Sequence, residues 1–523
     1  MLLTRTLHAT TPAGDMPVKN QPVMTAPTSM ALDMPDLVSE VQEAFEAQLD
    51  VSSLLAISTG LQAELRQHMV ASEQCMLPSF NYDLPTGQEK GVYLAVEVGG
   101  SNLRMALVDL YGRHRGVDCL KIRRQTASPI AREIRHSTGY SFFDWMAIQI
   151  REMLASEGEV RLEGDVVRMG VAWSFPIEYV PFSHILLARR LMDHSQTSIR
   201  SGNVLGMGKG FRCSDTIKNQ DLSDIIHAAC QRQKVNVRLD AIVNDTSSTL
   251  LARAYLDPAT RLAVVLGTGM NAAIHLPIAA FHPSKFDLRA EKPGPSITHV
   301  LTNTELSMFG KAIFPRSRWD EALNRAHIMP NYQPFEYLVA GGYMSEIVRR
   351  IMVDAAENDG LYVHGFPKTL LVPYSLDTHT LARIQLDKSA GLTATRNLLH
   401  EKHQSSVRPS FQDAAFIQKV VVSVSRRSIA YFAAGVHALT SLLQDLETEA
   451  GLESGLDHVS IGCDGSVINK YPGYMETAQE TLDQLQATEA KGRKRVLLEK
   501  TQDSAVLGAG VAGALAASSS PPG

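Results

Sequence analysis

Apolar residues fall into a regular pattern only after about residue 35. Helical spacing of apolar positions runs through LVSEVQEAFEAQL and then VSSLLAISTGLQAELRQHMV, which predicts two amphipathic helices. The preceding residues, 1–35, are rich in Pro, Thr and Met and predict a disordered leader. The final residues, 517–523, predict a polar tail.

Two later segments share one pattern of apolar strand, glycine turn and apolar strand. The first is LAVEVGGSNLRMALVDL from Leu94, and the second is LAVVLGTGMNAAI from Leu262. Both begin Leu-Ala-Val, turn on two glycines and place an Asn after the turn, which is typical of a hairpin. Two copies about 170 residues apart predict two lobes built on one plan.

The rest of the chain mixes strand and helix patterns. Strands are expected in VVRMGVAWSF, LDAIVND and DHVSIGCDGSV, and helices in SFFDWMAIQIREMLASEG and SDIIHAACQRQ. Two long helices are expected in FEYLVAGGYMSEIVRRIMVDAAEN and FIQKVVVSVSRRSIAYFAAGVHALTSLLQDLETEA. This mixture predicts an α/β fold.

Composition narrows the class of protein. A length of 523 residues predicts two to three domains, and 44% hydrophobic with 20% charged residues is ordinary for a soluble protein. The net charge of −5 argues against a nucleic-acid or membrane partner. The basic cluster Arg493–Arg495 precedes an apolar run and is interpreted as part of a solvated edge strand.

Cysteine use and the chain start bear on location. The five cysteines are scattered and form no Cys-x-x-Cys pair, which argues against a disulfide framework or a zinc site and favours a reducing compartment. No apolar run has the length of a membrane span. The start, MLLTRTLHATT, has some features of a transit peptide without a strong amphipathic pattern, so a cytoplasmic location is expected.

The glycine turns are candidate phosphate-binding loops. Gly99, Gly100, Ser101 and Asn102 form the first, and Gly267, Thr268 and Gly269 form the second. Backbone N–H groups at such turns cradle phosphate oxygens, because a Cβ would block close approach. A single turn of this kind is more often only a hairpin turn, but a matched pair is what a two-lobed nucleotide site requires.

Asp245 is the candidate catalytic base. It follows Asn244 at the end of the apolar strand pattern and starts a helix pattern. For an isolated Asp the simpler interpretation is a helix N-cap. The functional one is a general base that accepts a hydroxyl proton during phosphoryl transfer.

Other polar residues have two interpretations each. Glu97 is a candidate Mg²⁺ ligand through water, or an edge-strand carboxylate paired with a base. Lys209, among glycines, is a ligand contact or an exposed loop lysine. Glu305 and Glu336 accept bonds from sugar hydroxyls, or are acids favoured at helix starts.

Taken in order, these phrases resemble the eukaryotic hexokinase family from about Tyr93 to Ala516. The matching phrases are Glu97-Val98-Gly99-Gly100-Ser101-Asn102, Ser174-Phe175-Pro176, Gly208-Lys209-Gly210-Phe211, Asn244-Asp245-Thr246, Gly267-Thr268-Gly269-Met270-Asn271, Asn303-Thr304-Glu305 and Asp464-Gly465-Ser466. So many ordered matches are specific to the family, and the simpler interpretations lose weight.

The resemblance implies a two-lobed actin-like ATPase fold of the hexokinase type, with ribonuclease-H-like lobes, that binds a small-molecule sugar and ATP with Mg²⁺. It implies a mainly small lobe over 36–245, with the N-terminal helices, and a mainly large lobe over 246–516. Asp245 and Lys209 would be catalytic. The sugar would contact Ser174, Phe175, Lys209, Asn244, Asp245, Asn271, Glu305 and Glu336. The nucleotide would contact both glycine turns and Asp464, Gly465 and Ser466.

Departures from the family pattern point to the substrate. Gly208 stands for a Thr and Leu306 for a Trp, and both remove bulk near the expected sugar pocket. A roomier pocket predicts N-acetylglucosamine as the favoured hexose of a fungal type of enzyme. The alternatives are a kinase for glucose, fructose or mannose, and a catalytically weak regulatory relative. The last alternative draws on Glu97, which replaces an Asp, and on the altered glycine motif after Asp503.

Residues 179–195 interrupt the family pattern. Deleting these 17 residues restores it in full, and the codons for Glu178-Tyr179-Val180 can contain a splice-donor sequence. We interpret the segment as a retained intron in the gene sequence. The alternative is a surface loop, which costs little entropy even when long.

Overall fold

The fold is taken from a computed structural model. It describes residues 34–72, 74–155, 166–173, 198–204, 211–212, 217–286, 293–404, 406–488 and 492–518. Three expected segments lie outside the described residues: the leader up to residue 33, the insert 179–195, and residues 519–523 of the tail. So do three predicted site residues, Ser174, Phe175 and Lys209, and Gly208 beside them.

Two sheets carry the same strand order, which confirms the expected duplication of one plan. The first has five strands in the order β4-β3-β2-β5-β6, and the second has six in the order β1-β9-β8-β7-β10-β11. In the first, an antiparallel triplet is followed by two parallel strands, and the second repeats this plan with β1 added antiparallel at the edge beside β9. The strands are β1 (Leu77–Pro78), β2 (Gly91–Val98), β3 (Asn102–Leu110), β4 (Leu120–Pro129), β5 (Val167–Trp173), β6 (Val237–Val243), β7 (Thr260–Leu266), β8 (Met270–Pro277), β9 (His299–Asn303), β10 (His458–Asp464) and β11 (Arg495–Lys500).

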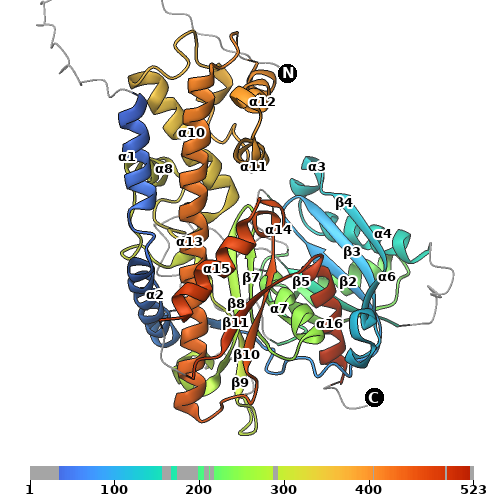
Figure 1. Ribbon diagram of the computed structural model, residues 1–523. Coiled ribbons are helices and arrows are strands. Elements are labelled where there is room, and N and C mark those ends of the chain that lie inside the picture. The colour runs from blue at the N-terminus through green and yellow to red at the C-terminus, as the bar shows by residue number, and fades with distance from the viewer. Residues whose placement is uncertain are drawn as a thin grey trace, which may run out of the picture.

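Some α-helices of the described residues lie against the two sheets, and the others pack on helices (Figure 1). They are α1 (Met34–Glu46), α2 (Val51–Ala71), α3 (Arg132–Arg135), α4 (Ser141–Ala155), α6 (Leu222–Arg232), α7 (Asp245–Leu256), α8 (Arg318–Ala326), α9 (Glu336–Val339), α10 (Gly341–Asn358), α11 (Thr378–Leu386), α12 (Thr393–His403), α13 (Phe411–Ala450), α14 (Ser466–Lys470), α15 (Tyr474–Gln486) and α16 (Ser504–Ser518). Helices α4 and α6 cover the outer face of the five-stranded sheet, and α7 and α16 lie between the two sheets. None of these helices is both long and apolar enough to cross a bilayer.

The layer between the sheets depends on small residues. A Cβ at Gly508 of α16 would lie 1.8 Å from the carbonyl oxygen of Ser248 in α7. A Cβ at Gly170 of β5 would lie 1.9 Å from the carbonyl oxygen of Ala509. The sequence SAVLGAGVAGALAAS therefore lets α16 approach both a helix and a strand at backbone contact distance.

Helix α13 organises the larger core. Its apolar residues pack with α2, α1, α10 and α15 against the six-stranded sheet. The N-terminal helices therefore pack on α13 and not on the five-stranded sheet, although they precede it in the chain. The chain passes from the six-stranded to the five-stranded sheet through residues 79–90, returns through α7, and crosses again between β11 and α16.

Two sequence expectations need correction and one is confirmed. The long helix expected from Phe335 is broken at Ala340, whose backbone is extended, into α9 and α10. Glu97 lies on β2, in the middle of its sheet and not at an edge. The run that follows Arg493 does form an edge strand, β11.

Candidate functional site

The second glycine turn abuts two other backbone segments. Gly267 donates its N–H to the carbonyl of Gly269 at 2.9 Å, and its own carbonyl accepts the N–H of Gly341 at 2.9 Å. A Cβ at Gly267 would lie 3.3 Å from the backbone nitrogen of Ser466. The turn after β7, the turn after β10 and the start of α10 thus meet at one place.

Gly465 lies where these three backbone segments come into contact, at a position that only glycine fits. Its φ is +113°, and an added Cβ would lie 2.2 Å from the carbonyl oxygen of Leu266. Asp464, which precedes it, accepts from the N–H of Gly465 at 2.6 Å and from the side-chain amide of Asn469 at 2.8 Å. Its other oxygen accepts from Ser504 at the start of α16. Asp464 therefore ties α16 to the turn, a role that sequence reasoning missed.

The start of α10 was also missed. Gly341 and Gly342 begin that helix only because the chain breaks at Ala340. A Cβ at Gly342 would be 3.9 Å from the carbonyl oxygen of Thr268. The signal in the sequence was the Gly-Gly pair inside the apparent long helix.

Glu97 is paired with a basic side chain, as one of its two interpretations predicted. Only 8% of its surface is exposed, and Oε1 accepts from Arg104 on the adjacent strand at 2.6 Å. The other oxygen, Oε2, is buried and has no hydrogen-bond partner among the described residues. Burial raises the pKa of Glu97, and the carboxylate charges of Asp245 and Asp464 raise it further, whereas Arg104 lowers it.

The geometry at Asp245 separates its two interpretations. Asn244 is the N-cap of α7, because its side chain accepts the N–H of Thr246 at 2.9 Å. Asp245 is the first residue of the helix, and its Oδ1 accepts the same N–H at 2.8 Å and the Thr246 hydroxyl at 3.2 Å. The capping position thus belongs to Asn244, which leaves Asp245 half-buried at the end of β6.

A chain of polar side chains leads from β8 to Glu305. The amide of Asn271 donates to Asn303 at 2.9 Å, and the amide of Asn303 donates to Glu305 at 2.7 Å. Glu305 has a left-handed backbone with φ of 52°, a strained conformation that is concentrated at functional sites. Burial raises its pKa, and the nearby charge of Asp245 does so as well. Asn303 is a member of this chain that the sequence motif contained without a predicted role.

Glu336 is joined to the second glycine turn. Its Oε2 accepts the N–H of Met270 at 2.9 Å, and only 8% of the residue is exposed. A Cβ at Gly269 would lie 2.8 Å from this oxygen. The glycine therefore leaves room for the carboxylate, so a predicted sugar contact and a predicted phosphate loop depend on each other.

The site offers one position for the indirect ligation of a cation. Among the described residues, no three His, Cys, Asp or Glu side chains are close enough to hold a metal by themselves. A buried carboxylate oxygen without a partner, on Glu97, is suited to accept from a water molecule of a hydrated cation. Mg²⁺ commonly keeps several waters and binds through one or two carboxylates and substrate phosphates, so these residues fit it.

Family models and known relatives match most of this chain. Two family models, both described as hexokinase, match residues 261–515 and residues 38–190 with 192–255. A rice (Oryza sativa subsp. japonica) protein named Hexokinase-4, chloroplastic is 31% identical over 87% of this chain and 83% of its own length. Hexokinase-2 of Candida albicans is 26% identical over 93% of both chains.

A solved structure carries the same fold. The hexokinase of Schistosoma mansoni complexed with glucose superposes with a TM-score of 0.73, over 92% of this chain and all of that one, at 23% identity. The expected two-lobed actin-like fold of the hexokinase type is thereby confirmed. The chain belongs to the hexokinase family of sugar kinases.

Proposed function

We propose that the chain transfers the γ-phosphoryl group of ATP to the 6-hydroxyl of a hexose, with Asp245 as the base. The proton of the sugar hydroxyl passes to the Asp245 carboxylate while the new O–P bond forms. The bond from the γ-phosphorus to the bridging oxygen breaks, and ADP leaves. The observation that carries the proposal is the position of Asp245 directly after β6, where its charge acts on both Glu97 and Glu305.

Each group near Asp245 has a separate proposed task. The carboxylates of Glu305 and Glu336 accept hydrogen bonds from sugar hydroxyls, and the side-chain amide of Asn271 also bonds to the sugar. The backbone N–H groups of the two glycine turns orient phosphate oxygens. Glu97 would hold Mg²⁺ through water. When bound, that ion supplies positive charge to the phosphate oxygens. Lys209, Ser174 and Phe175 keep their predicted roles from the sequence.

The hexose we propose as favoured is N-acetylglucosamine. Two smaller residues, Gly208 and Leu306, support it, because each is less bulky than the family residue and leaves room for an acetamido group. Leu306 is fully buried directly after Glu305, so any added room would lie behind that carboxylate. The relatives bear the general name hexokinase, and one was solved with glucose, which favours glucose as the alternative.

Substrate preference is tested by ADP release with N-acetylglucosamine, glucose, fructose and mannose under one set of conditions. The proposal expects the highest kcat/KM for N-acetylglucosamine. A higher value for glucose would replace it with the alternative. The assay should be run with and without residues 179–195, and a cDNA that encodes this segment would dismiss the retained-intron hypothesis. A cytoplasmic location and the lobe boundary at 245 remain predictions.

The base is tested with Asp245→Asn. General-base catalysis contributes about 10²- to 10⁴-fold, so kcat should fall by that factor while sugar binding, measured by calorimetry, persists. Asp50→Asn is a matched control, because Asp50 is an acidic residue at the start of α2, far along the chain from this site. Full activity of the Asp245→Asn protein would contradict the mechanism.

A further inference from the structure

Asp503 has an unusual backbone for the residue that precedes a helix. Its φ is 51°, in the left-handed region, whereas an ordinary N-cap residue is extended. Among the described residues its carboxylate accepts no N–H group of α16, so the side chain does not cap that helix. A non-glycine residue in this conformation is uncommon and is found preferentially at functional sites. The role of this carboxylate therefore lies outside the helix.

The carboxylate of Asp503 faces two side chains of the five-stranded sheet. Its Oδ1 accepts from the amide of Gln125 on β4 at 3.2 Å and lies 3.6 Å from Nη1 of Arg104 on β3. The next residue, Ser504, donates to Asp464 beside the second glycine turn. Asp503 and Ser504 thus contact both sheets near the glycine turns.

Arg104 is shared between two carboxylates. Its Nη2 donates to Oε1 of Glu97 on the adjacent strand at 2.6 Å, and its Nη1 faces Asp503. Burial lowers the pKa of Arg104, but three nearby carboxylates together raise it, and the guanidinium stays charged. Both terminal nitrogens of the guanidinium therefore face carboxylates of the protein.

Arg104 lies close to the first glycine turn. Asn102 ends that turn and begins β3, and Arg104 follows two residues later, about 7 Å along a strand. The side chain of Arg104 is 37% exposed, so part of it is open to solvent. A guanidinium binds phosphate with two parallel hydrogen bonds, as it binds carboxylate. A nucleotide phosphate at this turn and the carboxylate of Asp503 would therefore compete for one arginine.

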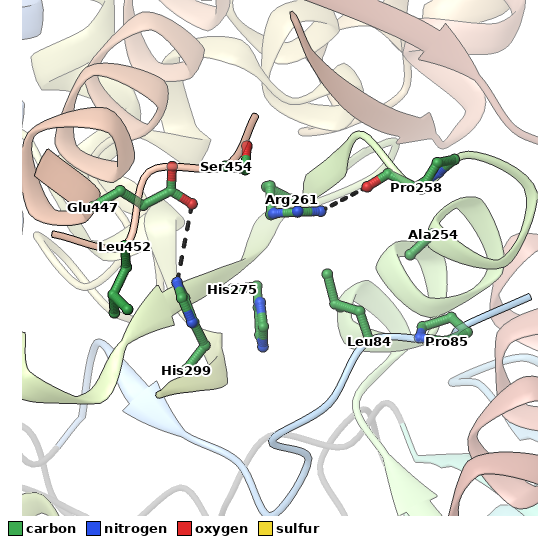
Figure 2. Close-up of a pocket in the computed structure, with 10 residues that line it drawn as sticks. All are labelled: Leu84, Pro85, Ala254, Pro258, Arg261, His275, His299, Glu447, Leu452 and Ser454. Atoms are coloured by element: carbon green, nitrogen blue, oxygen red, sulfur yellow. Dashed lines mark hydrogen bonds and ion pairs between the residues drawn. The ribbon is translucent and has the colours of Figure 1, made fainter. Parts of the chain in front are cut away.

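A second half-buried arginine, Arg261, differs in both respects. It lines a cavity near the start of β7, at the other end of that strand from Gly267 (Figure 2). Its Nη1 donates to the backbone carbonyl of Pro258 at 2.8 Å. Burial lowers the pKa of Arg261, although two nearby carboxylates oppose that shift. Of these two arginines, only Arg104 lies beside a glycine turn and is held by carboxylates that a phosphate can replace.

We propose that Asp503 limits the affinity of this chain for its nucleotide by holding the guanidinium of Arg104 away from the phosphate groups. Asp503 is then a positioning residue, since it acts through Arg104 and not on the reacting atoms. This role rests on the proposed kinase function, because it requires nucleotide phosphates at the first glycine turn. Removal of the Asp503 charge should therefore strengthen nucleotide binding, whereas loss of a purely structural contact would weaken it or leave it unchanged.

The test is calorimetric titration of the full chain with ADP and Mg²⁺, without sugar, in wild type and in Asp503→Asn. Asparagine is nearly isosteric with aspartate and also adopts the left-handed backbone, so the variant removes little besides the charge. We expect ADP to bind about two- to fivefold more tightly to Asp503→Asn, as release of a partly exposed ion pair allows.

Two further variants isolate the role of Arg104. Asp118→Asn removes an exposed carboxylate that pairs with Lys121 just before β4, at the end of β4 remote from the glycine turn, and should leave ADP affinity unchanged. Arg104→Lys keeps a positive charge beside Glu97, but an ammonium lacks the planar fork that faces two carboxylates. Adding Asp503→Asn to Arg104→Lys should therefore leave the ADP dissociation constant nearly unchanged.

Two results would overturn this role of Asp503. One is ADP binding by Asp503→Asn that is no tighter than that of wild type, and the other is the same gain in affinity with Arg104→Lys as without it. Failure of wild type to bind ADP would overturn both this role and the proposed function. Loss of turnover in Asp245→Asn with ADP binding intact concerns the base alone, so the two failures are distinguishable.

Discussion

A methyl group added at Gly269 tests the contact between the second glycine turn and Glu336, the proposed sugar-binding acid. The added Cβ would lie 2.8 Å from Oε2 of Glu336, whereas ordinary contacts begin at 3.4 Å. Either the carboxylate or the turn must move by about 0.6 Å. The same oxygen accepts the N–H of Met270 at 2.9 Å, so movement of the carboxylate weakens that bond.

The expected magnitude follows from this bond. A hydrogen bond to a charged group contributes about 1.5–3 kcal/mol, so kcat/KM for the sugar should fall by about 10- to 100-fold in Gly269→Ala. The loss should appear mainly as a raised KM, because Glu336 is proposed to bind the sugar and not to transfer its proton.

The assay is the initial rate of ADP release over a range of sugar concentrations at saturating ATP. Gly455→Ala is the matched control, because nothing lies within 4 Å of a Cβ added there. The double variant Gly269→Ala with Glu336→Asp withdraws the carboxylate from the new methyl group. Its loss should be smaller than the sum of the two single losses by about 0.5–3 kcal/mol. A sugar KM equal to that of Gly455→Ala, or strictly additive losses, would refute the reasoning.

Three further predictions concern the acids. In Glu97→Gln the apparent affinity for Mg²⁺, measured from the rate over a range of Mg²⁺ concentrations, should fall by about 10- to 100-fold with little change in sugar KM. An unchanged Mg²⁺ titration would exclude the proposed role of Glu97 in holding Mg²⁺. Because burial raises the pKa of Glu305 above its ordinary 4.5, its carboxylate takes up a proton at a higher pH than a free glutamate as the pH falls. The sugar kcat/KM should therefore drop on the acid side at a pH above 4.5, and a drop that Glu305→Gln leaves in place would belong to another group. Asp320→Asn should destabilise the protein by about 3–5 kcal/mol in urea unfolding, because it leaves the buried guanidinium of Arg427 without its bidentate partner. The control Glu401→Gln, at an exposed position of α12, should change stability by less than about 0.5 kcal/mol, and equal midpoints for the two variants would contradict this prediction.

Some parts of the site were accessible from sequence because they are local. Each glycine hairpin is a continuous stretch in which strand periodicity and turn chemistry agree, so both turns could be predicted without knowledge of the fold. Asn244 and Asp245 likewise mark a strand end and a helix start within a few residues. Assigning the capping role to Asn244 required the hydrogen bonds themselves.

Other parts depend on residues distant in the chain. The local sequence marks the break at Ala340 only by the Gly341-Gly342 pair. The start of α10 is held by the hydrogen bond from the Gly341 N–H to the Gly267 carbonyl, a contact that no local propensity encodes. The burial of Glu97 follows from the central position of β2, which the order of strands along the chain does not reveal.

By itself, the sequence determined the repeated hairpins, the α/β class, the family resemblance and the identities of the candidate base and acids, because these are carried by periodicity and short motifs. Only the tertiary structure decided that Glu336 rests against Gly269, that Asp464 holds the start of α16, and that Gly508 of α16 packs on Ser248 of α7. Those features join residues tens to hundreds of positions apart, and contact at that separation is set by the packing of the sheets and helices, not by local pattern.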